Sequence, residues 1–327
     1  MKTALLLPLL LLSLALKAQT YAERLGFPKG KKVIILHVDD AGMSYEANQG
    51  TLQSLQNGLA SSTSVMMPCA WVPQFMDFLK KNPTLDAGVH LTLTSEWDNY
   101  RWFPLVGKDK APGLYDPQGA FWHSVAQVVQ HASPDEVEAE IRAQLARYRQ
   151  FGVQPTHLDA HMGTLFHPKF LERYVKVGVQ ERIPILFPGG HATLVGKREP
   201  LAQSMRPLLK QIGEQLWNAG LPVLDDLDGT SYGWTLPAGT PATDKTLQQF
   251  KTQKFIELLQ TCQPGITYVI LHSADAGPHF DQISSSGQTR RGDMLAMLDP
   301  VLKAYIQREG IIVTTWRELS ERRKKVQ

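Results

Sequence analysis

Cysteine is scarce in this chain of 327 residues, which contains only Cys69 and Cys262. Neither lies in a pattern typical of a thiolate metal cluster. The two could form one disulfide in an oxidising compartment, but a sequence does not reveal whether they meet. We expect two separate buried thiols.

The chain also lacks a large excess of charge of either sign. Lysine and arginine total 34 and the acidic residues 31, so the net charge of +3 gives no case for nucleic-acid binding. The basic C-terminal segment RELSERRKKVQ is typical of a short terminal helix with a solvated face. Repeats, low-complexity tracts and domain linkers are absent, and 43% of the residues are hydrophobic. Disorder is therefore not expected, and the length suits one large α/β domain or two small ones.

The N-terminus has the pattern of a secretory signal peptide. Lys2 is followed by a leucine-rich run from Ala4 to Leu16, and Ala18 offers a small residue for cleavage before Gln19. The run is short for a membrane span, although an uncleaved anchor is the alternative. No cysteine follows it, which excludes a lipoprotein anchor. We predict a signal peptide over 1–18, a single domain over 19–327, export to the periplasm or the medium, and no stable membrane insertion.

Apolar runs alternate with amphipathic segments along the rest of the chain. The predicted strands are 33–38, 62–67, 87–94, 156–161, 183–187, 222–226, 266–272 and 311–315. About eight strand–helix repeats without a β-only region favour a parallel sheet, and the count suits a (β/α) barrel, complete or distorted. Active sites of such barrels lie at the carboxyl ends of the strands.

Two helices are predicted in detail. The segment SPDEVEAEIRAQLARYRQFG begins at Ser133, completes a capping box with Glu136 and ends before Gly152. Its predicted buried stripe consists of Val137, Ile141, Leu145 and Tyr148. The segment WVPQFMDFLKK predicts one apolar face made of Trp71, Phe75, Phe78 and Leu79.

The segment HVDDAGMS ends the first predicted strand with two adjacent carboxylates, Asp39 and Asp40. Each carboxylate disfavours ionisation of the other, and a cation beside them removes that conflict. One can then bind the metal while the other accepts a proton. The alternative is a solvated turn that opens the next helix, with Ser44 as its N-cap.

Histidines lie at or near the ends of three other predicted strands. His90 lies in DAGVHLTLT, His157 and His161 lie in PTHLDAHMG, and His272 ends the apolar run ITYVILH. A lone histidine in a strand is more often a hydrogen-bonded core residue than a ligand, but several at one sheet edge favour a site. Asp159 precedes His161 by two residues and can orient an imidazole ring.

Asp40, His90 and His161 would form a metal site of two histidines and one carboxylate. This donor set suits zinc, cobalt, nickel, manganese or iron, and magnesium less well. Three protein ligands leave positions open, as in catalytic sites. We expect Asp39 to act as the base and His272 to protonate the leaving group.

Three other functions use related residues. A non-haem iron oxygenase shares the donor set but usually has a β-sandwich fold. A phosphodiesterase would need a second metal, for which His37 and Asp159 are available, and phosphate-binding cations, which the strand-end motifs lack. A carbohydrate-binding protein on the same barrel would keep the site without turnover.

Two long segments, 95–132 and 227–245, follow predicted strands and would overhang the site. Their aromatic residues include Trp97, Tyr100, Trp102, Trp122, Tyr232 and Trp234. These rings could stack on a sugar, or they could hold the loops against the barrel.

The motifs resemble those of the YdjC-like carbohydrate deacetylases, the family that includes chitooligosaccharide deacetylase. The matching strings are HVDDAGMSYEANQGTLQSLQNGLASSTSVMMP, GVHLTLT and PTHLDAHMGTLFHP, in the family's order over residues 33–168. The later ILHSADAG matches more loosely. The resemblance implies a distorted TIM-like barrel that removes an acetyl group from an amino sugar with a divalent metal.

By this resemblance, the metal-binding histidines are His90 and His161, Asp40 is the third ligand and Asp39 is the base. The chain departs from the family pattern in three places. Ala41 replaces phenylalanine in the DDAG segment, Met162 and a later His167 replace a run of histidines, and Ser273 instead of proline follows His272. All of them lie near the inferred metal and bear on substrate choice.

Overall fold

The computed structural model describes residues 19–198 and 204–326. The predicted signal peptide, 1–18, lies outside the described residues. Within them, no helix combines the length and the apolar character needed to cross a membrane. Cys69 and Cys262 are both buried and unpaired, so the prediction of two separate thiols is confirmed.

A single parallel sheet forms the centre of the molecule. Its strands in the described part of the chain are β1 (Lys32–Ala41), β2 (Ser62–Val65), β3 (Ala87–Leu91), β4 (Leu158–Ala160), β5 (Asp226–Asp228), β6 (Gly265–His272) and β7 (Ile312–Val313). The order is β4-β3-β2-β1-β6-β5, with β7 beside the start of β1, and every pairing is parallel. The predicted α/β fold with a parallel sheet is confirmed.

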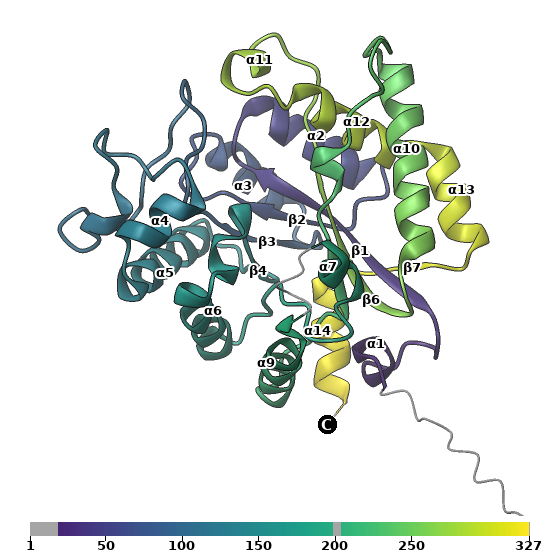
Figure 1. Ribbon diagram of the computed structural model, residues 1–327, viewed down its shortest axis with the longest axis horizontal. Helices are drawn as coiled ribbons and strands as arrows, with labels where there is room; N and C mark the ends of the chain where they lie inside the picture. The colour runs from purple at the N-terminus through teal and green to yellow at the C-terminus, as the bar shows by residue number, and fades with distance from the viewer. Residues whose placement is uncertain (1–18, 199–203, 327) are drawn as a thin grey trace, which may run out of the picture.

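Helices surround this sheet (Figure 1). Those described are α1 (Tyr21–Arg24), α2 (Tyr45–Gln56), α3 (Val72–Lys81), α4 (Val125–His131), α5 (Pro134–Gln150), α6 (Pro168–Glu181), α7 (Thr193–Arg198), α9 (Arg206–Asn218), α10 (Asp244–Thr261), α11 (Phe280–Ile283), α12 (Gly287–Met297), α13 (Pro300–Arg308) and α14 (Trp316–Lys325). Short 3₁₀ turns are η1 (Pro112–Leu114), η2 (His161–Phe166) and η3 (Ser231–Gly233). The helix α14 is the predicted basic terminal helix.

The strand predicted over 183–187 is wrong. This stretch makes only isolated bridges, from Ile185 to Leu158 of β4 and from Pro188 to Leu224 ahead of β5. Pro184 and Pro188 have no N–H to donate, so a regular ladder cannot form there. The barrel is therefore distorted where this irregular segment links β4 to β5.

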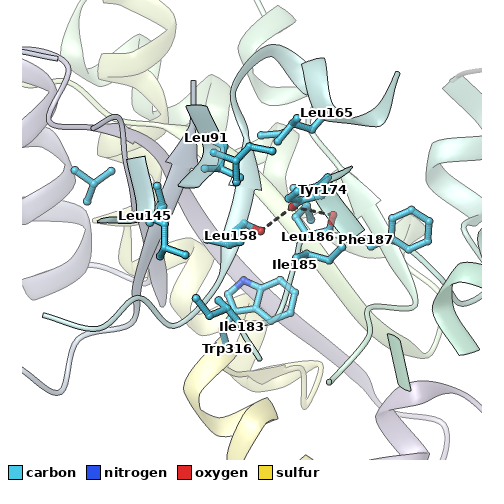
Figure 2. Close-up of a cluster of buried hydrophobic side chains, with 14 of the residues drawn as sticks. Leu91, Leu145, Leu158, Leu165, Tyr174, Ile183, Ile185, Leu186, Phe187 and Trp316 are labelled. Atoms are coloured by element: carbon cyan, nitrogen blue, oxygen red, sulfur yellow. Dashed lines mark hydrogen bonds between the residues drawn. The ribbon is translucent and has the colours of Figure 1, made fainter. Parts of the chain in front are cut away.

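Tyr174 of α6 fixes the irregular segment in place. Its hydroxyl donates to the carbonyl of Leu158 at 2.8 Å and lies 3.4 Å from the carbonyl of Leu186 (Figure 2). Leu158 belongs to β4 and Leu186 to the irregular segment beside it, so one hydroxyl contacts both. The hydroxyl adds to two backbone hydrogen bonds at this edge, from Leu158 N–H to the Pro184 carbonyl and from Leu186 N–H to the Leu158 carbonyl, both 2.8 Å long.

Sequence signals account for the helices closely. The helix α5 has the predicted capping box between Ser133 and Glu136, and all four residues of its predicted stripe are buried. In α3, Phe75 and Leu79 are buried as predicted. Trp71 is not part of that face: it is the N-cap, 41% exposed, and contacts the ring of Tyr45.

The two faces of β1 have different roles. Ile34, Leu36 and Val38 are buried against the apolar residues of α10 and α13. Burial of each such side chain contributes about 1.5–3 kcal/mol. The alternate residues His37 and Asp39 point to the other face, inside the barrel, since side chains of a strand alternate. The polar interior holds the candidate site.

Candidate metal centre

Asp39 and Asp40 both line one cavity, although they are successive residues of β1. In a regular strand they would face opposite ways. The register between β1 and β2 shifts between Val38 and Ala41, and Asp40 has a φ of 67°. This left-handed backbone costs on the order of 1–3 kcal/mol in a non-glycine residue, a strain often found at functional sites. The irregularity turns both carboxylates into the cavity.

The turn after the carboxylates is tightly built. Gly42 has a φ of 84°, and a Cβ there would lie 2.8 Å from a methyl of Val72, so only glycine fits. Its N–H donates to the side chain of Asn48 at 2.7 Å. Ser44 caps α2 by accepting from the N–H of Ala47 at 3.1 Å. The N-cap prediction is therefore confirmed, and it is compatible with a site at Asp40.

Asp40, His90 and His161 present three donor atoms to one point. Asp40 Oδ1 lies 3.2 Å from His90 Nε2 and 3.3 Å from His161 Nδ1, and the two nitrogens are 3.3 Å apart. Ligands at about 2.0–2.2 Å from one ion, with angles of 90–109°, are separated by roughly 2.8–3.6 Å. Asp40 Oδ1 is buried without a hydrogen-bond partner among the described residues. The triangle therefore fits a metal ion.

Each imidazole is oriented by a carboxylate on its opposite side. His90 Nδ1 donates to Asp159 Oδ1 at 2.7 Å, and His161 Nε2 donates to Glu96 at 3.1 Å. These bonds leave His90 Nε2 and His161 Nδ1 free to bind a cation, as is usual for metal-ligating histidines. The prediction that Asp159 orients a ring is confirmed.

Neighbouring carboxylates raise the pKa of both imidazoles. Burial alone would lower the pKa of His90, but Asp159 and Asp39 outweigh it and raise the pKa well above its usual value. Burial opposes ionisation of His161 as well, yet Glu96 and Asp40 raise its pKa to about 9. A bound cation has to replace those protons, since metal ligands are deprotonated.

Arg290 of α12 occupies the other oxygen of Asp40. Its Nη2 lies 2.7 Å from Asp40 Oδ2, and both side chains are almost fully buried. Burial favours the neutral acid, but the charge of Arg290 and the imidazoles of His161 and His90 hold the pKa of Asp40 well below its usual range. The guanidinium keeps Asp40 ionised and directs Oδ1 toward the imidazoles.

Asp39 lies beside the donor triangle. Its Oδ1 is 3.2 Å from His37 Nε2, and its Oδ2 is 3.8 Å from His90 Nε2 and 3.9 Å from His272 Nε2. His272 is held at the end of β6 because its backbone N–H donates to Asp293 Oδ2 at 3.1 Å. Burial lowers the pKa of His272. The two predicted proton-transfer residues thus face one another.

Asp159 gathers donors from behind the triangle. In addition to His90, its carboxylate contacts His37 Nε2 at 3.0 Å, the hydroxyl of Tyr268 at 3.1 Å and His157 Nε2 at 3.6 Å. Burial lowers the pKa of His157. His157 is therefore a core residue of this network rather than a member of the donor triangle.

Most loop aromatic residues hold the loops, which was one of the two alternatives. Trp102 is 2% exposed and donates to the carbonyl of Thr94. Trp122 stacks on His131, and Trp234 packs against Phe255. Tyr232 differs from these residues, because it is 42% exposed and lines the cavity. Its ring lies against the ring of His272.

Sequence reasoning missed Glu96 and Arg290. Glu96 was visible as an acidic residue after a predicted strand, close to the GVHLTLT motif. Arg290 lies in a helix far along the chain, and no motif connects it to Asp40. The strand-end motifs lack cations, as stated above, but α12 brings Arg290 to within 2.7 Å of Asp40.

The fold and the donor triangle define a distorted (β/α) barrel of the kind that holds a metal at the carboxyl ends of its strands. Residues 33–308 match the family described as YdjC-like protein. The chain is 31% identical over 299 residues to a carbohydrate deacetylase of Thermus thermophilus, covering 91% of this chain and 97% of the relative. It is 22% identical to a carbohydrate deacetylase of Thermoanaerobacter pseudethanolicus, covering 87% and 98%.

The fold also has a counterpart among crystal structures. A protein of Enterococcus faecalis V583, named for cellobiose-phosphate cleavage, superposes with a TM-score of 0.70 at 20% identity. The match covers 88% of this chain and 99% of that protein. This chain belongs to the YdjC-like protein family.

Removal of either imidazole tests the donor triangle. We expect His90→Ala and His161→Ala to lose stoichiometric zinc by elemental analysis while the far-UV circular dichroism remains native, because the site lies at the strand ends. The exposed His279 is the matched control, and His279→Ala should retain the metal. Full zinc occupancy in both test variants would contradict the assignment.

Proposed function

We propose that this protein is a metal-dependent carbohydrate deacetylase, which hydrolyses the amide of N-acetylated sugars or oligosaccharides. The observation that carries the proposal is the triangle of Asp40, His90 and His161 at a cavity, with Asp39 directly beside it. The names of the relatives support it, since the chain spans nearly the whole length of the Thermus thermophilus deacetylase.

A cation held by Asp40, His90 and His161 would polarise the amide carbonyl as a Lewis acid and would lower the pKa of a water. Asp39 accepts the proton of the attacking water. His272 Nε2, 3.9 Å from Asp39 Oδ2, passes a proton to the departing nitrogen. The C–O bond forms first by addition of the water to the carbonyl carbon. The C–N bond then breaks once its nitrogen is protonated, which leaves acetate and a free amine. Arg290 and Glu96 hold Asp40 and His161 in position.

The donor set favours zinc or another first-row transition metal over magnesium. Two imidazoles and one carboxylate suit borderline ions, whereas magnesium prefers a shell of oxygen ligands. Zinc is therefore the first metal to supply in an assay.

A phosphodiesterase is less compatible with this geometry. Two-metal sites need a second set of ligands that holds another metal about 3.5–4 Å from the first. The available group of His37, His157 and Asp159 is fully buried, and its members contact one another. A non-catalytic carbohydrate-binding protein would retain the site but release no acetate.

We also propose export, on the basis of the leader pattern in residues 1–18. We expect the mature protein recovered from the periplasm or medium of an expressing bacterium to begin at Gln19, because Ala18 offers the small residue that signal peptidases require. Mass spectrometry of the intact chain measures this directly. A cytoplasmic product that retains residue 1 would contradict export.

Asp39→Asn tests the base. We expect this variant to retain zinc and to lose kcat by roughly 10²–10⁴-fold, the usual contribution of general acid–base catalysis. Asp98→Asn changes a highly exposed carboxylate and serves as the control. If zinc is lost in Asp39→Asn, Asp39 is a ligand, and the roles of the two aspartates are exchanged.

The reaction class is tested with the zinc-loaded protein. We expect acetate to be released from N-acetylglucosamine oligomers faster than model phosphodiesters are hydrolysed, since the second group of possible ligands, His37, His157 and Asp159, is fully buried. Acetate is measured enzymatically and the diester product by absorbance. Faster diester hydrolysis would favour a phosphodiesterase, and binding without any acetate release would favour a carbohydrate-binding protein.

A further inference from the structure

The cavity that Asp40 and His161 line extends far beyond these two residues. Its volume is about 740 Å³, in the range of about 300–1,000 Å³ typical of pockets for drug-sized ligands. An acetyl group presents a single methyl and occupies only a small part of this space. The remainder must accommodate another part of the substrate.

The wall away from the donors is built mainly of hydrocarbon. It lies along the irregular edge between β4 and β5, and it includes Phe166, Leu171, Phe187, Leu209, Leu227 and Ile270. Figure 2 shows Phe187 and Leu186 at this edge, beside Tyr174. The distortion of the barrel thus creates an apolar cleft next to the reacting centre.

This wall offers little to sugar hydroxyls. Its polar side chains are few: His167 accepts from the N–H of Lys169 at 3.2 Å, and the partly exposed Arg198 lies 3.6 Å from Asp228. A hydroxyl buried without a hydrogen bond costs about 1–3 kcal/mol on protein scales. An oligosaccharide laid along this wall would leave several hydroxyls unpaired, whereas a hydrocarbon would not.

We propose that the amide substrate is amphiphilic: an N-acylated amino sugar that carries a hydrocarbon group, which occupies this wall. The proposal rests on the proposed function and names the substrate class of the same site. The hydrocarbon can belong to an acyl chain longer than acetyl, or to an apolar group attached at the reducing end of the sugar. Both place methylenes against the same residues.

Two substrate series separate these sources. In the first, glucosamine carries N-acetyl, N-butanoyl or N-hexanoyl groups; in the second, N-acetylglucosamine carries a methyl, butyl or hexyl aglycone. Free amine released by the zinc-loaded protein is measured fluorimetrically. We expect kcat/KM to rise two- to fourfold per methylene in one series, the upper value being equivalent to about 0.8 kcal/mol. Flat responses in both series would overturn the proposal.

Leu209 and Leu208 of α9 form a matched pair for this test. Leu209 lines the cavity, whereas Leu208 is 41% exposed and does not. We expect Leu209→Gln to reduce the gain per methylene by at least half and Leu208→Gln to preserve it. Equal behaviour of the two variants would contradict the location of the hydrocarbon.

Calorimetry separates this proposal from the proposed function. The Asp39→Asn protein, loaded with zinc, is titrated with the hexyl and methyl glycosides and with the N-hexanoyl and N-acetyl sugars. A hexyl or N-hexanoyl ligand that binds at least tenfold more tightly than its short counterpart supports the apolar site, even if no amide is cleaved by wild-type protein. Cleavage of short amides without any hydrocarbon preference would reject the apolar site alone.

Discussion

The buried carboxylate of Asp159 is the constraint on which the rest of the site depends. A charge inside a barrel is costly unless hydrogen bonds and counter-charges satisfy it. Here the contacts come from His37 of β1, His90 of β3 and Tyr268 of β6, so one carboxylate on β4 links four strands. The bond to His90 also sets which ring nitrogen faces the cavity. The same hydrogen bond therefore satisfies a buried charge and orients a proposed metal ligand.

A second constraint is local to the end of β1. Two successive residues can serve one site only if the strand is interrupted, and the register shift with the positive φ of Asp40 provides this. Arg290 then engages one oxygen of Asp40 and leaves the other for the imidazoles. The proposed division of labour between Asp39 and Asp40 rests on Arg290. The Oδ2 atoms of both aspartates lie 3.9 Å from His272 Nε2, but that of Asp40 is engaged by Arg290 at 2.7 Å.

The irregular closure of the barrel connects the fold to substrate choice. Where prolines prevent a regular strand between β4 and β5, only isolated bridges form, and side chains of this segment line the cavity. That wall is apolar and adjoins the donor triangle. A deacetylase with this architecture can distinguish substrates by a group distant from the amide, since binding energy from non-reacting parts contributes to catalysis.

Much of this protein was determined by local sequence. The strand–helix alternation predicted the parallel sheet, the capping box predicted α5, and strand-end motifs identified Asp40, His90 and His161, because the carboxyl ends of parallel strands meet at one edge. The irregular 183–188 segment, Glu96 as the partner of His161 and Arg290 as the partner of Asp40 were decided only by the tertiary structure. The same holds for the apolar wall, whose residues come from separate elements. Hydrophobic periodicity and short motifs depend on residues that are close in the sequence. The contacts listed here depend instead on how distant segments pack around a buried charge.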